Sequence, residues 1–365
     1  MTFLRGLVSP GAGAAPFEGV VELDGPTIAR VERAHENGEG GLVLVPGFVD
    51  LQVNGVGDAD FATADPGVWR TALQRLAAAG VTTCCPTLVS APLDAYGAPL
   101  AVASSFAGHG GTTVGAEVVG VHLEGPFLGG APGAHPVDLL RPADVGWLAS
   151  LLDAHPGLVR IVTLAPEADP GGDAVRFLAG RGVVVALGHT SATYDRARAA
   201  ADGGARLVTH LFNGMAPLHH RAPGLAGAAL DDDRLTASVI ADLVHVHPAL
   251  LRTAIAAKRD LLLVSDAVAT PGLTVGDDGA ARLADGTLAG ATALLDRALR
   301  NVVGLGVALE RAVELVSTNP ARLLGLADRG VLAPGARADV VALDRATLSV
   351  RAVWLAGTPQ PFVQK

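Results

Sequence analysis

The sequence is poor in cysteine, and its two cysteines, Cys84 and Cys85, are adjacent within an apolar run of the 365-residue chain. Adjacent cysteines rarely pair, and a buried thiol behaves as a small hydrophobe, so we expect both side chains in the core. The chain therefore has no disulfide framework, which is typical of proteins kept in a reducing cytosol. We expect a cytoplasmic protein.

The sequence also lacks a basic stretch, a signal peptide and a long apolar run. Its formal net charge of −9 is dispersed along the chain, so nothing matches a phosphate backbone and we expect no nucleic-acid partner. Arg5 and Gly6 interrupt the first apolar residues, which argues against a secretory signal. No uncharged apolar run reaches membrane length, so we expect no membrane partner. With 50% hydrophobic residues, the chain can fill one large core.

Apolar runs of strand length recur along the middle of the chain. They are rich in Val, Ile, Leu and Thr and are continuous, which is typical of parallel strands buried on both faces. Helix-like segments lie between several of them, and this order predicts an α/β fold, a (β/α)₈ TIM-like barrel. The runs are 48–53, 81–89, 118–124, 159–165, 183–189, 207–212, 236–241 and 260–266.

Three helices have recognisable starts. Asp65-Pro66 is a good start for a helix over 68–79, because Asp caps and Pro fits the first turn. We expect Ser191 to begin a second helix over 192–201, and Pro248 to open a third that runs to Lys258. The connection 125–157 is long and rich in Gly and Pro, and the connection 213–235 shows no strong periodicity. Long loops after barrel strands are where substrate loops belong.

The two ends of the chain differ from its middle. Both carry short runs punctuated by glycine, which are typical of antiparallel strands; in the C-terminal part these are 330–332, 338–343 and 350–355. We therefore expect a small β-sandwich module formed by residues 1–45 and 330–365, flanking a barrel of residues 46–329.

Three of the apolar runs end on a potential metal ligand: Glu124, His189 and His210. Taken singly, each histidine could be an ordinary hydrogen-bonded residue, and Glu124 could be a surface or capping carboxylate. Together, one carboxylate and two imidazoles form a ligand set that leaves room for water. In a barrel, the strand ends converge on the face that carries the chemistry. Such ligands suit Zn²⁺ or Fe²⁺.

Asp266 ends the last of these runs. It is either a helix cap or, beside a metal-activated water, a general base that later protonates a leaving amine. Arg221 lies in a loop, where it could be solvated or could bind a phosphate or carboxylate through its planar guanidinium. Backbone N–H groups near Asn213 and Gly214 could also contact an anion.

Several motifs together identify a resemblance. The most specific are His122-Leu-Glu-Gly-Pro126 and the segment 209–227, which contains Thr209-His-Leu-Phe-Asn213 and Pro223-Gly-Leu-Ala-Gly227. With them the chain resembles the N-acetylglucosamine-6-phosphate deacetylase family of the amidohydrolase superfamily, over nearly its whole length. Further matching stretches are 46–55, 80–83, 86–87, 165–167, 188–190, 265–267, 319–321 and 335–339.

The resemblance implies a role for each matching residue. Glu124, His189 and His210 match the metal ligands, and Asp266 matches the catalytic aspartate. His135 matches a histidine on a mobile loop that contacts the substrate acetamide. The remaining matches are to phosphate-binding positions, of which the arginine can come from the neighbouring subunit, so a homodimer is expected. These phosphate-binding positions are Asn213, Gly214, Arg221 and His245.

The chain departs from the wider superfamily in two places. Many amidohydrolases carry His-x-His on the first strand and bind two metals, whereas this chain has Gln52-Val53-Asn54. Neutral amides are poor ligands for a second zinc, so we expect one divalent metal ion. The loop 128–134 is short and lacks the basic residue often found before the histidine at position 135.

The expected reaction is hydrolysis of the 2-acetamido group of N-acetylglucosamine 6-phosphate to glucosamine 6-phosphate and acetate. Alternatives are the galacto epimer, N-acetylgalactosamine 6-phosphate, or another amidohydrolase substrate such as a cyclic amide. A cyclic-amide enzyme usually has the two-metal first strand that is missing here. A non-catalytic barrel that binds sugar phosphate is the alternative from a different class, although this chain keeps all three ligands and the aspartate.

Overall fold

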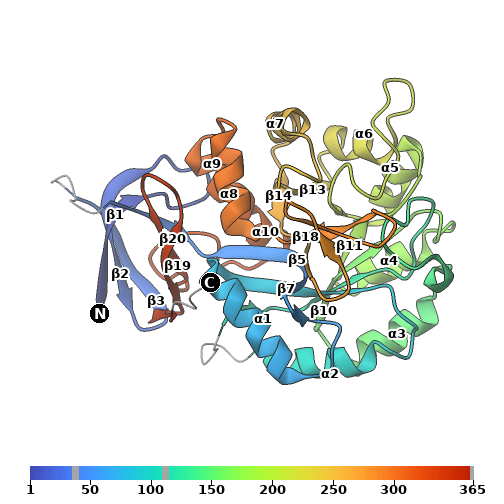
Figure 1. Ribbon diagram of the computed structural model, residues 1–365, viewed down its shortest axis with the longest axis horizontal. Helices are drawn as coiled ribbons and strands as arrows, with labels where there is room; N and C mark the ends of the chain where they lie inside the picture. Colours follow the sequence, from blue (N-terminus) through green and yellow to red (C-terminus); the bar gives the residue numbers. More distant parts are fainter. Residues whose placement is uncertain (35–40, 109–114, 362–365) are drawn as a thin grey trace.

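Eight parallel strands form the centre of the molecule (Figure 1). The computed structural model describes residues 1–34, 41–108 and 115–361. Neighbouring strands follow one another in chain order, as expected when each is connected to the next by a crossover. The strands are β5 (Phe48–Gly57), β7 (Val81–Val89), β9 (Val121–Glu124), β10 (Val159–Leu164), β11 (Val184–Leu187), β12 (Leu207–Val208), β13 (Thr236–Ile240) and β14 (Leu261–Val264).

The ring of strands is closed only in part. After β14 the chain turns at Ser265 and Asp266 into β15 (Ala267–Ala269), which pairs in parallel with β5. The backbone N–H of Asp266 donates to the carbonyl of Gln52 at 2.9 Å. A short segment therefore joins the last strand to the first, where a full ladder would complete a barrel. The amidohydrolase-type barrel expected from the sequence is confirmed in this partly closed form.

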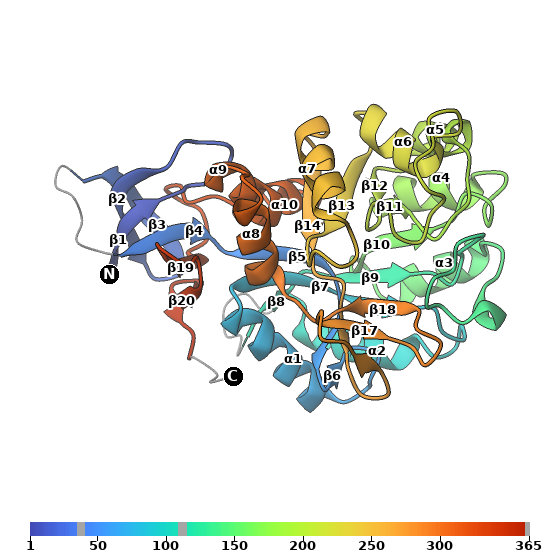
Figure 2. The ribbon, with the colours of Figure 1, turned by 45° about the horizontal axis from the view of Figure 1, so that its top comes forward.

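Helices cover the outside of the strands (Figure 2). The expected cap at Asp65 is confirmed, since its carboxylate accepts the N–H of Gly67 at 2.7 Å. The helices are α1 (Pro66–Ala78), α2 (Gly97–Phe106), α3 (Val145–Ala154), α4 (Asp173–Gly180), α5 (Tyr194–Gly203), α6 (Gly224–Asp231), α7 (Pro248–Ala257), α8 (Leu295–Gly304), α9 (Leu309–Val313) and α10 (Asn319–Leu323), with a 3₁₀ turn η1 (Val137–Leu139) and a π-helical turn η2 (Glu314–Thr318).

Some predicted element boundaries were wrong. The helix expected from Ser191 begins at Tyr194, because Thr193 caps it while the Ser191 N–H donates to Glu167. The run 118–124 is two strands, β8 (Glu117–Val118) and β9, separated at Gly120, which has a φ of +147°. Of the run 207–212 only the first two residues form a strand. Residues 330–332 are not a strand, and Leu332 donates instead to the carbonyl of Pro10.

A second sheet draws its strands from both ends of the chain and lies beside the barrel (Figure 1). Its strands pair into one continuous sheet in the order β21-β20-β19-β4-β1-β2-β3. The separate β module is thus confirmed as one sheet, while its description as a sandwich and its exact boundaries stay predictions. The strands are β1 (Thr2–Val8), β2 (Phe17–Asp24), β3 (Thr27–Arg33), β4 (Leu42–Pro46), β19 (Val340–Asp344), β20 (Val350–Leu355) and β21 (Thr358–Pro359).

The interior of the barrel is filled by apolar side chains from its strands, including Leu51, Ile161 and Leu262. Cys85 belongs to this cluster and Cys84 to the layer between strands and helices, both fully buried and free. Burial raises the pKa of Cys85 to about 12, so its thiol stays protonated and inert. Because side chains fill the barrel interior, a ligand can be bound only at the open ends of the strands.

A hairpin inserted after β14 extends over those strand ends. This hairpin segment has three short antiparallel strands, β16 (Thr274–Val275), β17 (Ala280–Arg282) and β18 (Leu288–Ala291). Its last strand, β18, also pairs with β15. The remaining short strand, β6 (Ala59–Asp60), pairs with the end of β5 on the same side. None of the described helices is long and apolar enough to span a membrane.

Candidate active site

Four candidate residues lie at the C-terminal ends of barrel strands. Glu124 is the last residue of β9, while His189, His210 and Asp266 each follow a strand by two residues. Those three have positive φ angles of 49°, 29° and 48°, a left-handed conformation that costs a non-glycine residue roughly 1–2 kcal/mol. The sharp turn at each strand end directs the side chain into the barrel mouth.

Glu124, His189 and His210 form a tight triangle. The Oε1 atom of Glu124 lies 3.0 Å from the Nε2 atom of each histidine, and the two Nε2 atoms are 3.0 Å apart. The opposite nitrogen, Nδ1, lies 3.2 Å from a backbone carbonyl in both rings, that of Ala131 for His189 and that of Asn213 for His210. Because a carbonyl only accepts, each Nδ1 carries a proton and donates it.

This arrangement fits a cation. With Nδ1 protonated, each neutral imidazole directs the lone pair of its Nε2 atom at Oε1 of Glu124. The two Nε2 atoms and this oxygen are all acceptors, and no hydrogen-bond donor lies between them. Burial lowers the pKa of His210, but the hydrogen bond and charge of Glu124 outweigh it and raise that pKa to about 8. The triangle therefore favours one added positive charge, which a proton or a divalent metal ion can provide.

His135 lies at the edge of the triangle. Its ligand atom lies within 4.8 Å of those of Glu124 and His189, and its ring meets that of His189 edge-on at 4.4 Å between centroids. Since His210 approaches the other two ligand atoms to 3.0 Å, we assign the tight set to Glu124, His189 and His210. His135 is a neighbour that faces the same cavity.

The tautomer of His135 is set by Ser90. The Ser90 backbone N–H points at Nδ1 of His135 from 3.4 Å, and the Ser90 hydroxyl lies 2.9 Å from the same atom. Burial lowers the pKa of His135 to about 3, so the ring is neutral at pH 7. With Nδ1 accepting, the remaining proton sits on Nε2, which can donate to a bound ligand.

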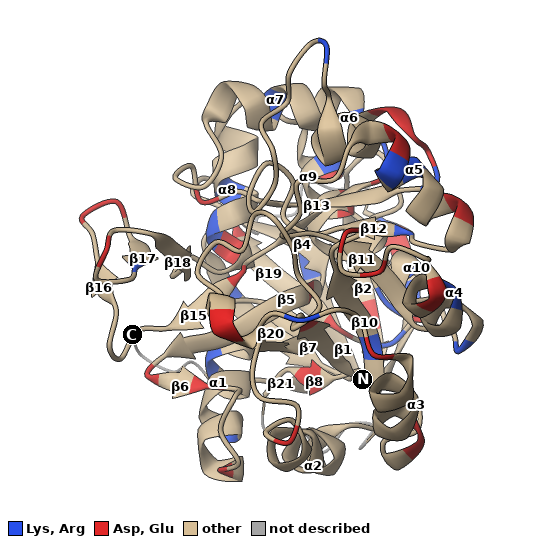
Figure 3. Cartoon of the chain, turned by 90° about the vertical axis from the view of Figure 1, so that its right-hand side faces the viewer, with Lys and Arg blue, Asp and Glu red and all other residues tan. Residues whose placement is uncertain are grey.

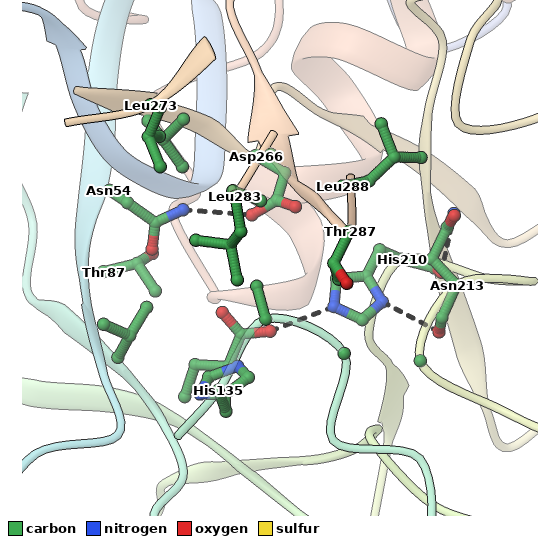
Figure 4. Close-up of a pocket in the computed structure, with 18 of the residues that line it drawn as sticks. Asn54, Thr87, His135, His210, Asn213, Asp266, Leu273, Leu283, Thr287 and Leu288 are labelled. Carbon is green, nitrogen blue, oxygen red and sulfur yellow. Dashed lines mark hydrogen bonds and ion pairs between the residues drawn. The ribbon is translucent and has the colours of Figure 1, made fainter. Parts of the chain in front are cut away.

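Asp266 is held by the side-chain amides of Gln52 and Asn54, which lie two residues apart on β5. Nδ2 of Asn54 donates to Oδ1 of Asp266 at 3.0 Å (Figure 4). Nε2 of Gln52 donates to the same oxygen at 3.2 Å and to Oε1 of Glu124 at 3.0 Å. These amide nitrogens act as donors to carboxylates. Oδ1 of Asn54 is buried without a hydrogen-bond partner in the described residues, and so remains available to a ligand.

The environment of Asp266 favours an aspartate that can exchange a proton near neutral pH. Burial and then the negative charge of Glu124 raise the pKa of Asp266 to about 6. A carboxylate with such a pKa is partly ready to accept and then return a proton, which is what a general base that later acts as an acid needs.

A deeper carboxyl group, Asp50, supports this corner from below. It is fully buried, and its Oδ1 accepts the backbone N–H groups of Ser265 at 3.2 Å and Gln52 at 3.3 Å. Ser265 is the residue directly before Asp266, and Gln52 is one of the two residues that donate to the Asp266 carboxylate. Asp50 thus joins β5 to the turn after β14, at the point where the barrel ladder is incomplete.

The loop that carries His135 is anchored by Glu167, which lies just after β10. Oε1 of Glu167 accepts the N–H of Gly130 and the N–H of Ser191, both at 2.9 Å, and Oε2 accepts the hydroxyl of Thr190. Burial alone raises the pKa of Glu167, but these hydrogen bonds outweigh it and lower the pKa. One carboxylate therefore ties the loop of His135 to the segment that follows His189.

The far end of the cavity is lined by polar groups. Asn213, Gly214 and His245 line it. Nδ1 of His245 lies 2.7 Å from the carboxylate of Asp242, which fixes the ring and leaves Nε2 for a ligand. The whole cavity has a volume of about 490 Å³, within the range of small-molecule sites.

Arg221 does not reach the cavity of its own chain. It is exposed, and its guanidinium donates to Nε2 of His220 at 2.8 Å. The loop between β12 and α6 projects from the body of the molecule (Figure 3), and Arg221 is the one Lys or Arg residue in it. The structure thus brings together every other residue singled out from the sequence and leaves Arg221 apart.

Sequence reasoning missed several residues of this region. It treated Gln52 and Asn54 only as lost ligands, although their position two residues apart on the first strand already placed both beside the ligands. It did not anticipate Asp50, Ser90 or the hairpin after β14. These residues act through hydrogen bonds across the barrel, and no local pattern marks them.

Comparisons with known proteins agree on one family. The sequence pattern of the amidohydrolase family matches residues 43–363. The chain is 41% identical over 345 residues to N-acetylglucosamine-6-phosphate deacetylase of Bos taurus, covering 87% of this chain and 83% of the relative. It is 39% identical over 335 residues to N-acetylgalactosamine-6-phosphate deacetylase of Escherichia coli O157:H7, covering 88% of each.

A solved structure agrees over nearly the whole length. The chain superimposes with a TM-score of 0.89 and 36% identity on a variant of N-acetyl-D-glucosamine-6-phosphate deacetylase from Mycobacterium smegmatis, in complex with N-acetyl-D-glucosamine-6-phosphate. The match covers 98% of this chain and 99% of that one.

Proposed function

The chain belongs to the amidohydrolase family, and from this membership we propose that it hydrolyses the acetamido group of N-acetylglucosamine 6-phosphate to glucosamine 6-phosphate and acetate. The observation that carries the proposal is the triangle of Glu124, His189 and His210 beside Asp266. Relatives named for this reaction match most of the chain at about 41% identity. The non-catalytic alternative conflicts with the presence of a complete ligand set and a base.

One divalent metal ion fits this site. Glu124, His189 and His210 would hold it, and their nitrogen and oxygen donors favour Zn²⁺ or Fe²⁺. Such an ion polarises an amide carbonyl and lowers the pKa of water to about 7. A second ion is not expected, since this chain has the neutral amides of Gln52 and Asn54 on its first strand, and neutral amides are poor ligands for zinc.

The side chains of this chain perform the proton transfers. Asp266 accepts a proton from the attacking water and returns it to the departing nitrogen. The Nε2–H of His135 donates to the acyl oxygen and stabilises the negative charge that develops there. Asn54 and Gln52 hold Asp266 in place for both steps.

The remote phosphate orients the substrate. Asn213, Gly214 and His245 line the end of the cavity that would receive it. Binding energy from this group can hold the acetamide in a reactive position. Arg221 is proposed to complete the phosphate site of a neighbouring subunit, which is consistent with its exposed position and requires a homodimer. Since the substrate is a sugar phosphate, we place the enzyme in the cytoplasm.

The galacto epimer is a second candidate substrate, because a relative named for N-acetylgalactosamine 6-phosphate is 39% identical. The test is acetate release from each purified epimer by the metal-loaded enzyme, with metal content measured in parallel. Acetate from the gluco substrate supports the proposal, and acetate from the galacto substrate alone favours the second candidate. Release from neither would refute both.

A further inference from the structure

We propose that the cavity has an acyl end, lined by Ala62, Val89, Ala269, Leu273 and Leu283, that accepts N-acyl groups larger than acetyl. The enzyme then also hydrolyses N-propanoyl and N-butanoyl hexosamine 6-phosphates. This inference rests on the proposed function, because it takes the position of the phosphate from it.

The two ends of the cavity lie on opposite sides of the barrel. Asn213 follows β12, and His245 follows β13, whereas Asn54 and Thr87 belong to β5 and β7. In the strand order β14-β13-β12-β11-β10-β9-β7-β5 these pairs are separated by three strands in one direction around the barrel and by β14 in the other. In Figure 4, Asn54 and Thr87 accordingly lie to the left of Asp266, and Asn213 lies to the right.

The chemistry of the substrate assigns the acyl group to one end. In a pyranose ring, C2 lies across from C5, which carries the C6 phosphate. The acyl nitrogen is on C2, so the acyl carbon and its chain extend away from the phosphate. When the phosphate occupies the Asn213 and His245 end, the reacting carbonyl lies at the centre beside Asp266. The tail of the acyl group then points to the side of Asn54 and Thr87.

That side has one apolar wall, beside the polar residues Asn54, Asp60 and Thr87. Leu273 and Leu283 come from the hairpin after β14, while Ala269 belongs to β15, which pairs with β5. Val89 ends β7 and is 39% exposed, and Ala62 is exposed in the segment after β6. Burial of each additional methylene against the apolar wall strengthens binding about fourfold. This wall therefore matches an aliphatic chain.

The chemistry with a longer acyl group is unchanged. Water adds its oxygen to the acyl carbon, the carbon–nitrogen bond breaks, and the nitrogen takes a proton. The products are the amino sugar phosphate and propanoate or butanoate, and no oxidant or further reactant is needed.

The experiment compares kcat/KM for N-acetyl, N-propanoyl and N-butanoyl glucosamine 6-phosphate, measured by release of the free amine. We expect the propanoyl value of the wild-type enzyme within about fivefold of the acetyl value. A pocket closed around acetyl would reject the extra methylene by about tenfold or more. Failure to hydrolyse the N-acetyl substrate contradicts the proposed function itself. Normal hydrolysis of N-acetyl with more than tenfold rejection of N-propanoyl overturns only the acyl end.

Two variants locate the effect. Ala62→Leu narrows the acyl end, and we expect the propanoyl-to-acetyl ratio of kcat/KM to fall at least tenfold. Leu273→Ala widens it, and the butanoyl-to-acetyl ratio should rise. The matched control is Ala101→Leu, at an exposed position of α2 outside the cavity, which should leave all ratios unchanged. Equal ratios in wild type and both acyl-end variants would overturn the assignment.

Discussion

Gln52 offers a sharp test of how the site holds its base. Its side chain is 1% exposed, and its one amide nitrogen donates to Asp266 at 3.2 Å and to Glu124 at 3.0 Å. Gln52→Leu keeps most of the volume of the side chain and removes the donor. The variant therefore leaves packing largely intact while Asp266 keeps only the hydrogen bond from Asn54.

The size of the effect follows from the charge of the acceptors. A hydrogen bond to a charged group contributes about 1.5–3 kcal/mol, and each 1.36 kcal/mol in the barrier changes the rate about tenfold. We therefore expect kcat to fall roughly 10- to 150-fold. The lost hydrogen bond stabilised the charged form of Asp266. The pKa of this carboxyl, already raised to about 6 by burial and Glu124, should rise further.

The assay is acetate release between pH 5 and 9, with bound metal measured on the same samples. In Gln52→Leu the acid limb of the kcat profile should move to higher pH, because Asp266 must be deprotonated to act as a base. Gln74→Leu makes the same substitution on α1, outside the cavity, and should match wild type. A Gln52→Leu enzyme with kcat within threefold of wild type and an unmoved acid limb would refute the reasoning.

Other predictions follow from the same contacts. Asp266→Asn should retain metal and lose turnover by orders of magnitude; near-normal kcat would rule Asp266 out as the base. Arg221→Ala should weaken hydrolysis of the 6-phosphate far more than that of unphosphorylated N-acetylglucosamine, and an equal loss on both would contradict its phosphate role. Removing metal with a chelator should lower Tm, since a bound ligand at 100 times its Kd stabilises by about 2.7 kcal/mol; an unchanged Tm after verified metal loss would contradict this. Because hydrogen bonds lower the pKa of Glu167 below its ordinary value of 4.5, its charge stabilises the fold above that pH. The stability difference between wild type and Glu167→Gln in urea should stay constant above pH 5 and shrink as the pH falls below 4.5; a difference that grows in acid would show the opposite sign.

The triangle of Glu124, His189 and His210 was accessible from the sequence because it depends on one geometric rule. Parallel strands in a barrel end at the same mouth, so polar residues after buried runs converge even when they are far apart in the chain. Glu124, His189 and His210 are separated by 65 and 21 positions, yet their ligand atoms meet at 3.0 Å. This prediction required only that each run contain a strand. The strand in the run 207–212 ends at Val208 and not at residue 212, and this error did not affect the prediction.

Other features depend on context that no local pattern carries. The helix α6 shows no amphipathic period because six of its residues, from Gly224 to Ala229, are all buried. The start of α5 depends on which residue caps it. Glu167, 24 positions before Ser191, accepts both the N–H and the hydroxyl of Ser191, whereas the hydroxyl of Thr193 accepts the N–H of Arg196 and caps the helix. Arg221 illustrates a third case, since its proposed partner lies on another chain.

The backbone at the strand ends is strained where the candidate site residues lie, so these positions cost folding stability. His189, His210 and Asp266 all adopt positive φ, where glycine would relieve roughly 1–2 kcal/mol at each position. The fold retains side chains there, and each points into the barrel mouth because of that turn. The barrel interior below them is filled by buried apolar residues, which supplies the stability that the mouth lacks. Asp50 is a buried carboxyl that holds the turn of Asp266 against β5, so it supports the position of Asp266 more directly than it supports Glu124, His189 and His210.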